Sequence, residues 1–300
     1  MRLKKWLKRL LILFILGGIA GYVITYHVAP YAIIAKHTLT GEIPNNDELV
    51  SFEKMNVLGI DSVQLDSYLV SPKNDSIKGI VILIHGIGSC KEQFIDLARK
   101  FADEQIGSFI FDLRAHGKSE GEYCTYGFQE KYDVQNIVSK LKSHYPNLPI
   151  GIMGSSLGGA VAIQALELDE RIQFGVIECT FGQLDQIVFD YQKRFTFGVG
   201  FKFITDIALE RAGEIADFDP EKIRPINSVK QIEQPMFIAH GDKDIHISPE
   251  YGKALYDNLA SIDKHFELVK GADHNYIHQI GGAEYSRKVL NFINRQLESK

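Results

Sequence analysis

Residues 149–168, PIGIMGSSLGGAVAIQALEL, decide the fold that we expect for this chain. A strand-like apolar run leads into Gly154-Ser155-Ser156-Leu157-Gly158, and a helix-like run rich in small residues follows. The motif G-x-S-x-G between a strand and a helix forces its central side chain outward and needs small neighbours. It therefore predicts Ser156 as a nucleophile, with Ser155 as a supporting residue. The other reading is a glycine-rich phosphate or packing turn.

Strand-like and helix-like runs alternate on both sides of this turn, which predicts an α/β fold with a mainly parallel, eight-stranded sheet and helices on both faces. In the expected helix 128–143, Phe128, Tyr132, Ile137 and Leu141 are the expected inward positions. The expected strands are two within 55–70, then 79–84, 108–113, 149–153, 174–179, 235–240 and 265–269; the other expected helices are 91–105, 157–168, 249–260 and 283–298.

Residues 181–230 are less regular and rich in aromatic side chains. A loop of this length in a compact domain is usually functional or disordered, and so much aromatic surface argues against disorder. We expect a small helical cap over the site, with a helix over 199–212. The alternative is a peripheral helix packed against the core.

A second polar motif, His85-Gly86-Ile87-Gly88, directly follows the apolar run 79–84. An acyl-transfer enzyme needs two N–H donors aimed at the oxyanion of its tetrahedral intermediate. We expect these donors to be the backbone N–H groups of Leu157 and Ile87. His85 is expected to be a structural histidine bonded to the backbone and not the catalytic base.

An acid and a base follow the last two expected strands. Asp242 and Asp244 come after 235–240, and both are carboxylates at a strand end that could orient an imidazole. His274 comes after 265–269 and completes the order Ser, Asp, His that this architecture uses. We expect His274 to be the base. His246 and His278 are weaker alternatives.

The N-terminus carries a basic cluster and then an uncharged apolar run, Leu10 to Val28. A helix needs about 20 such residues to cross a ~30 Å hydrocarbon core. We expect an uncleaved single-pass membrane anchor; the alternatives are a cleaved signal peptide and a buried helix. The positive-inside rule places the N-terminus in the cytoplasm and the following domain on the extracytoplasmic side. The basic residues are Arg2, Lys4, Lys5, Lys8 and Arg9.

These runs divide the chain into three parts: an anchor over residues 1–35, a polar linker over 36–54, and a catalytic domain over 55–300 that contains the cap. We expect the anchor to contribute nothing to the core of the catalytic domain.

The composition excludes some classes of function. The net charge of −5 offers no basic face for a nucleic acid. The chain has no GxGxxG or HExxH motif, so we expect no cofactor and no metal. Cys90, Cys124 and Cys179 are too far apart for a CxxC motif, and we expect three buried or partly buried thiols. The alternative is one disulfide with one thiol left over.

From about residue 55 to 297 the chain resembles the α/β-hydrolase superfamily, and most closely its membrane-anchored serine aminopeptidase-like or Bem-type hydrolases. Residues 112–119, DLRAHGKS, are similar to the superfamily's D-x-R-G-x-G-x-S loop, with Ala115 at the usual glycine. The resemblance implies that the acid is Asp244.

Together these patterns predict a serine hydrolase that cleaves carboxylic esters through an acyl-enzyme on Ser156. Its partners would be a small-molecule or acyl-ester substrate and, through the N-terminal helix, a membrane. A serine peptidase of the same fold is the first alternative, because motifs alone do not fix the substrate. A non-catalytic binding module is the second, although such modules typically lose a triad member and none is lost here.

Overall fold

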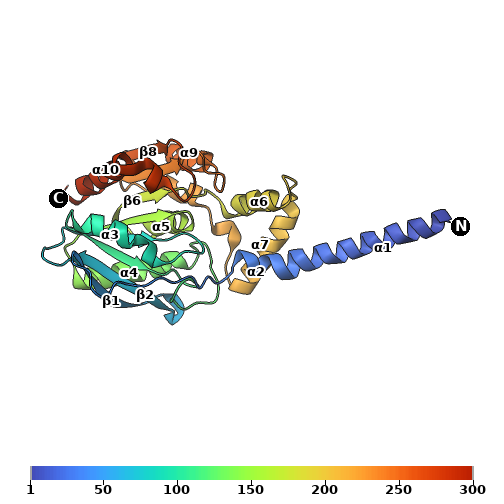
Figure 1. Cartoon of the computed structure of the whole chain (residues 1–300), viewed down its shortest axis with the longest axis horizontal. Helices are drawn as coiled ribbons and strands as arrows, with labels where there is room; N and C mark the ends of the chain where they lie inside the picture. Colours follow the sequence, from blue (N-terminus) through green and yellow to red (C-terminus); the bar gives the residue numbers. More distant parts are fainter. Residues whose placement is uncertain (1, 299–300) are drawn as a thin grey trace.

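An eight-stranded sheet forms the centre of the protein (Figure 1). The computed structural model describes residues 2–298, so the expected domain limits at residues 1 and 300 lie outside it. The strand order is β1-β2-β4-β3-β5-β6-β7-β8; β2 pairs antiparallel with β1 and β4, and all other pairs are parallel. The predicted mainly parallel, eight-stranded α/β sheet is confirmed. The strands are β1 (Val50–Leu58), β2 (Gln64–Pro72), β3 (Gly79–Ile84), β4 (Ile106–Phe111), β5 (Ile150–Ser155), β6 (Ile172–Glu178), β7 (Met236–Gly241) and β8 (Lys264–Val269).

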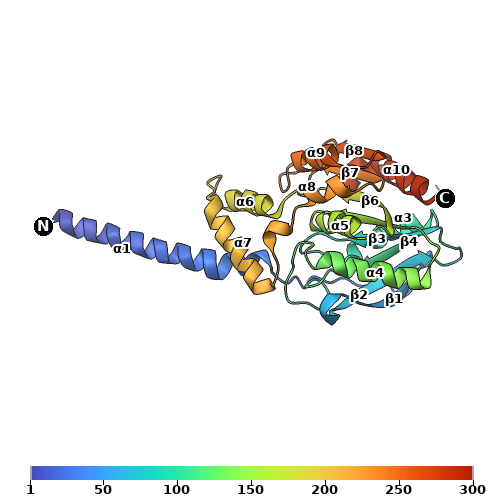
Figure 2. The ribbon, with the colours of Figure 1, turned by 180° about the vertical axis from the view of Figure 1, so that it is seen from behind.

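Helices cover both faces of this sheet (Figure 2). The apolar side chains form two buried clusters, one on each face, and each cluster includes residues from the helices above it. One face carries α3 (Ile95–Ala102) and α10 (Ile277–Glu298). The opposite face carries α4 (Glu130–His144), α5 (Leu157–Leu168), α8 (Pro225–Ser228) and α9 (Pro249–Asn258).

Two helices differ in detail from the expectation. Tyr132 on α4 is 37% exposed, so the expectation that it points inward was wrong. It lies five residues before the buried Ile137, which places it on the opposite side of a helix with 3.6 residues per turn. α10 begins at Ile277 instead of residue 283, and Gly282 interrupts it with a φ of 57°. The regular helix beyond this glycine is the one that the sequence predicted.

The linker boundary also needs correction. β1 begins at Val50 and pairs with β2 from its first residue, so the last five residues of the expected linker 36–54 belong to the sheet. This edge strand is partly exposed along its length, and its mixed composition conceals it in the sequence. The preceding residues are also held: the His37 N–H donates to the carbonyl of Ala115 (2.8 Å), and Asp47 pairs with Arg99 (2.7 Å).

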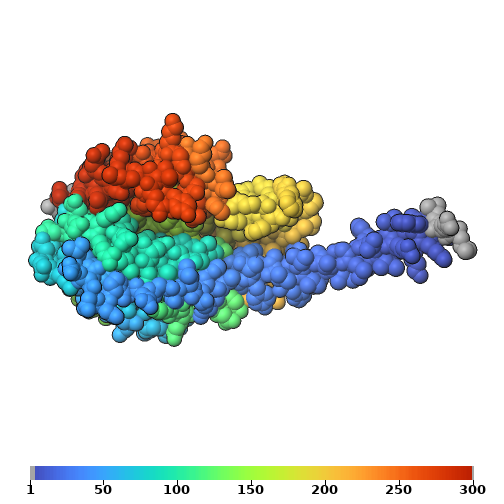
Figure 3. Space-filling view, in the orientation of Figure 1, coloured from blue at the N-terminus to red at the C-terminus, as the bar shows by residue number. Residues whose placement is uncertain are grey.

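The N-terminal segment leaves the body of the protein as one long helix (Figures 1 and 3). It consists of α1 (Arg2–Val23), a π-helical turn (Ile24–Val28) and α2 (Ala29–Ile33). Its most apolar 18-residue window has a mean hydropathy of 1.9 and is not buried against the protein, so it is long and apolar enough to cross a membrane. The π-turn precedes Pro30, which has no N–H for the carbonyl of Tyr26 and whose ring would crowd it.

The end of this helix belongs to the catalytic domain, contrary to the expected anchor limit at residue 35. Ile34 is fully buried within one core cluster. Its carbonyl accepts the Cys124 N–H (3.2 Å), and the Tyr126 hydroxyl donates to the carbonyl of Ile33 (2.6 Å). The expectation that the anchor contributes nothing to the core was therefore wrong. The sequence did not reveal this, because an apolar segment such as residues 29–35 fits a membrane anchor and a protein core equally well.

Residues 181–230 form two long helices and several short turns. α6 (Leu184–Phe195) and α7 (Lys202–Ala216) lie between the sheet and the N-terminal helix (Figure 2). α7 replaces the expected helix 199–212, and α6 was not predicted. The turn Pro220–Lys222 contacts α6 and α7, whereas α8 and the turn after it pack on α5 and α9 instead of covering the site. The three cysteines are buried and free, which confirms the expectation of three separate thiols.

Candidate active site

The turn around Ser156 has a strained backbone. β5 ends at Ser155, α5 begins at Leu157, and Ser156 between them has φ 56° and ψ −121°. A non-glycine residue with positive φ stores strain and is typical of a nucleophile turn. Both flanking glycines are sterically required, because a Cβ on Gly154 would lie 2.2 Å from the Gly158 carbonyl oxygen, and one on Gly158 would lie 2.1 Å from that of Ile84.

The structure brings Ser156, His274 and Asp244 into one hydrogen-bonded chain. Nε2 of His274 lies 3.0 Å from the Ser156 Oγ, and Nδ1 of the same ring lies 2.7 Å from Oδ2 of Asp244. The three residues follow β5, β8 and β7, respectively. These strands are parallel, so their carboxyl ends meet at one edge of the sheet.

Both carboxylate oxygens of Asp244 accept hydrogen bonds. Its Oδ1 accepts the backbone N–H groups of His246 and Ile247, both at 2.8 Å. Its Oδ2 lies near His240 (3.2 Å) and His274. Burial alone would raise the pKa of this carboxyl, but the hydrogen bonds from His240 and His274 outweigh burial and hold the pKa well below its usual range. Asp244 is therefore a carboxylate that can orient an imidazole.

The alternative acid does not reach His274. Asp242 turns toward the neighbouring loop, where its Oδ1 accepts the Gly271 N–H at 2.5 Å. The two aspartates are two residues apart, but the turn at the end of β7 sends their side chains to different partners.

The alternative bases are also held elsewhere. The His246 ring lies tilted beside that of His274, with ring centroids 5.5 Å apart, and its Nδ1 accepts from Arg194 (3.0 Å). His278 pairs with the buried Glu178 (3.0 Å). Within residues 2–298, no hydrogen bond joins either ring to Ser156. The geometry therefore supports neither His246 nor His278 as the base.

The two expected oxyanion donors flank the nucleophile. Leu157 is the first residue of α5, so its N–H has no acceptor within the helix and lies at the positive end of the helix dipole. The loop that carries Ile87 passes against Ser156, since a Cβ on Gly86 would lie 3.3 Å from that of Ser156. Ile87, Leu157 and Ser156 line the same cavity. This arrangement is compatible with an oxyanion hole.

His85 is bonded to the backbone, as predicted. Its Nδ1 donates to the carbonyl of Gly86 (2.8 Å), and its Nε2 accepts the Leu113 N–H (3.0 Å). Complete burial, aided by the nearby His116, lowers the pKa of His85 to about 3, so the ring stays neutral. It ties the loop that bears Ile87 to the loop that follows β4.

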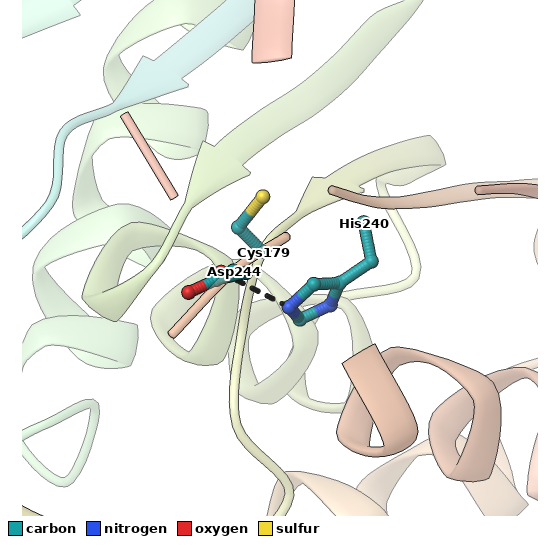
Figure 4. A group of neighbouring side chains, drawn as sticks. All are labelled: Cys179, His240 and Asp244. Carbon is teal, nitrogen blue, oxygen red and sulfur yellow. Dashed lines mark hydrogen bonds and ion pairs between the residues drawn. The ribbon is translucent and has the colours of Figure 1, made fainter. Parts of the chain in front are cut away.

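Sequence reasoning missed the role of His240, the last side chain before the Asp242–Asp244 turn. Figure 4 shows it beside Asp244 and Cys179. Its Nε2 donates to the carbonyl of Ile247 (2.9 Å) and approaches Oδ2 of Asp244, so it helps to position the Asp244 carboxylate. The only signal was its place at the head of the motif HGDKD.

The same three side chains lie close enough to hold a metal ion, with donor atoms within 4.8 Å of one another. Their chemistry does not fit one. Burial, together with the negative charge of Glu178, raises the pKa of the Cys179 thiol far above its usual range, whereas a metal needs the thiolate. Both oxygens of Asp244 already accept hydrogen bonds.

A cavity of about 700 Å³ opens above Ser156, which is a typical size for a ligand pocket. The α6–α7 pair forms one side of it, and none of the residues that line it carries a charge. The opposite side was not foreseen, because it belongs to the N-terminal helix. Gly21, Ile24, Thr25 and Ala29 contribute to it.

Several curated proteins, among them the following three, are similar to this chain in sequence. An uncharacterized Bacillus subtilis (strain 168) protein, YqkD, is 24% identical over 89% of the chain and 88% of its own length. Caffeoylshikimate esterase of Arabidopsis thaliana is 25% identical over 69% of the chain and 74% of its own length. Human monoglyceride lipase is 33% identical over a shorter region, 29% of each chain.

The family described as "Serine aminopeptidase, S33" matches residues 75–196, which include Ser156 but end before Asp244 and His274. Among solved structures, the Pyrococcus furiosus esterase Pf2001 superposes with a TM-score of 0.71 and 24% identity, over 88% of this chain and 97% of its own. This likeness shows the fold. Fold and matches together place the chain in the α/β-hydrolase superfamily, as a hydrolase enzyme of the α/β-hydrolase type.

Proposed function

We propose that this hydrolase cleaves carboxylic esters through a triad of Ser156, His274 and Asp244. The observation that carries the proposal is the 3.0 Å contact between Ser156 Oγ and His274 Nε2 at the base of an uncharged, apolar cavity. A nucleophile within hydrogen-bond reach of a base, which a third group orients, is the arrangement that covalent acyl transfer requires.

The chemistry follows from the hydrogen bonds. Asp244 accepts the Nδ1 proton of His274, which leaves Nε2 free to take the hydroxyl proton as Ser156 attacks the carbonyl carbon. The N–H groups of Leu157 and Ile87 would stabilise the oxyanion. His274 then returns the proton to the leaving alcohol, and water releases the acyl group from Ser156 by the same steps.

The cavity favours esters over peptides. A peptidase that holds a free amino terminus needs a carboxylate in its pocket, and no charged side chain lines this one. Two of the named relatives act on esters or glycerides by name. The serine-peptidase alternative is supported by the description of the matching family, which names an aminopeptidase.

The test is labelling with a fluorophosphonate probe, followed by assays on p-nitrophenyl esters and aminoacyl p-nitroanilides. We expect Ser156→Ala to abolish both labelling and ester hydrolysis, and the matched variant Ser155→Ala to retain labelling. Turnover of the anilides alone would favour the peptidase. A folded wild-type protein that is never labelled at Ser156 would show that it is not a serine hydrolase.

We also propose that the N-terminal helix anchors the protein in a membrane, with its basic end in the cytoplasm and the catalytic domain on the other side. The hydropathy of the helix and its lack of burial support this proposal. Single cysteines placed at either end of the helix, in a background without native cysteines, would report the topology by their accessibility to an impermeant reagent. A cytoplasmic C-terminus would contradict the orientation.

A further inference from the structure

One face of the N-terminal helix is a wall of the cavity above Ser156. Gly21, Thr25, Ala29 and Ala32 line the cavity, and their spacing of four, four and three residues puts them on one side of the helix. These four side chains are small, and the larger Ile24 and Ile33 of the same helix also line the cavity. At Gly21 a Cβ would have no atom of the described residues within 4 Å, so there is free space beside it. The helix thus leaves room between itself and the cap.

This wall lies within the apolar part of the helix. The uncharged run from Leu10 to Val28 is about 28 Å long as a helix, close to the thickness of a hydrocarbon core. Gly21 lies seven residues, or about 10 Å, before the end of that run. If the helix spans a membrane, the outer end of the cavity opens at the depth of the acyl chains.

The loop that joins α6 to α7, at the tip of this helix pair, is also apolar. Phe195 and Phe201 line the cavity and are 78% and 54% exposed, which places them at its mouth. Phe197 and Phe203 at the same tip are also exposed. α7 packs against the residues of the helix from Ile24 onward, and Phe195 and Phe201 line the same cavity as Gly21. Exposed phenylalanines at the mouth of an apolar cavity are suited to hydrocarbon and not to water.

We propose that the substrate is a long-chain acyl ester dissolved in the bilayer, and that the N-terminal helix guides its chain to Ser156. The inference rests on the proposed ester hydrolysis and on the proposed membrane anchor. The ester group would reach Ser156 while its chain stays between the small-residue face and α6–α7. The acyl chain then stays out of water on its way to Ser156. This favours long chains, because each buried methylene raises the binding constant by roughly a factor of four. The helix is a specificity element as well as an anchor.

The products leave in opposite directions. Cleavage of the acyl carbon–oxygen bond sends the alcohol to water with the proton from His274. Attack of water on the acyl-enzyme restores the Ser156 hydroxyl and releases the carboxylic acid, whose chain already points toward the bilayer.

The test compares two glycines of the same helix in the full-length protein in lipid nanodiscs. Gly21 lines the cavity, whereas Gly18 does not; a Cβ at either position has nothing within 4 Å among the described residues. The readout is the ratio of kcat/KM for hexadecanoyl over butanoyl p-nitrophenyl ester. We expect Gly21→Leu to lower this ratio about tenfold, because the leucine fills the space of roughly two methylenes. Gly18→Leu should leave the ratio unchanged.

Thr25→Leu, one turn further along the same face, is a second variant and should lower the ratio in the same direction. Wild-type ester hydrolysis with an unchanged ratio in both cavity variants would overturn this inference alone. An equal fall in Gly18→Leu would also overturn it, since the effect would then come from the helix in general. Absence of probe labelling at Ser156 in the wild type would instead overturn the proposed function.

Discussion

The protein contains two carboxylate–histidine pairs at the same edge of its sheet, and they differ in what lies beyond the histidine. Asp244 follows β7 and pairs with His274, and Glu178 ends the neighbouring β6 and pairs with His278. Both carboxylates are buried, and the two histidines are four residues apart. From composition and spacing alone, either pair could belong to a triad.

The third partner separates the two pairs. The free nitrogen of His274 faces the Ser156 hydroxyl. Glu178, by contrast, also accepts the Tyr285 hydroxyl at Oε1, and the rings of His278 and Tyr285 pack edge to face. The Glu178 pair therefore fastens α10 to the sheet. A buried acid that orients an imidazole becomes catalytic only where a nucleophile stands at the other nitrogen.

The largest expected effect comes from removing one histidine and then the other. His274→Ala should lower kcat for ester hydrolysis by a factor on the order of 10⁶, because it removes the base and leaves only binding and the oxyanion donors. His278→Ala should leave kcat nearly unchanged and lower thermal stability. The measurement is steady-state kinetics on a p-nitrophenyl ester, with circular dichroism to establish folding. Equal losses of kcat in both variants would show that the two carboxylate–histidine pairs do not differ in function.

The next effect concerns the acid. Asp244→Asn should lower kcat by about 10⁴, because an amide cannot accept the Nδ1 proton in the orientation that the reaction needs. Asp242→Asn is the matched control, two residues away in the same turn. It should affect kcat far less, since the Asp242 side chain bonds only the Gly271 N–H among the contacts found in residues 2–298. A larger loss in Asp242→Asn would move the proposed triad to that residue.

The smallest effect is a pH dependence of stability from the second pair. The negative charge of Glu178 raises the pKa of His278 above its unfolded value. The pair therefore contributes stability that is complete below the unfolded pKa of about 6.5 and is lost as pH rises through the folded value.

His278→Gln should accordingly lower Tm at about pH 5.5 and have little effect at about pH 9. Because His278 is 37% exposed, solvent screens the pair and the difference should be below about 1 kcal/mol. Thermal melts of wild type and variant at both pH values measure it. A greater loss at high pH would reverse the sign and refute the assignment.

Local patterns in the sequence were sufficient for the fold and for the turn at Ser156. The strand 79–84 is buried along its whole length, so a continuous apolar run identifies it. The turn needs glycines within a few residues of the serine, and this requirement is visible as a short motif. His274 could also be proposed from its place after a strand.

Other features depended on which distant residues meet, and only the tertiary structure decided them. Asp242 and Asp244 have the same chemistry and nearly the same position in the chain, and the direction of a single turn separates them. The same limit applies to His240 behind the acid and to Ile34 in the core.

The cavity above Ser156 shows this limit most clearly, because Gly21 and Ser156 line one wall and the base of the same space from positions far apart in the sequence. Periodicity reports the local preferences of a segment for a helix or a strand and for water or apolar surroundings. It cannot report which apolar surfaces face one another, since that depends on packing across the whole chain. The sequence therefore determined the fold and the residue types of the chemistry, and the tertiary structure decided their partners and the shape of the pocket.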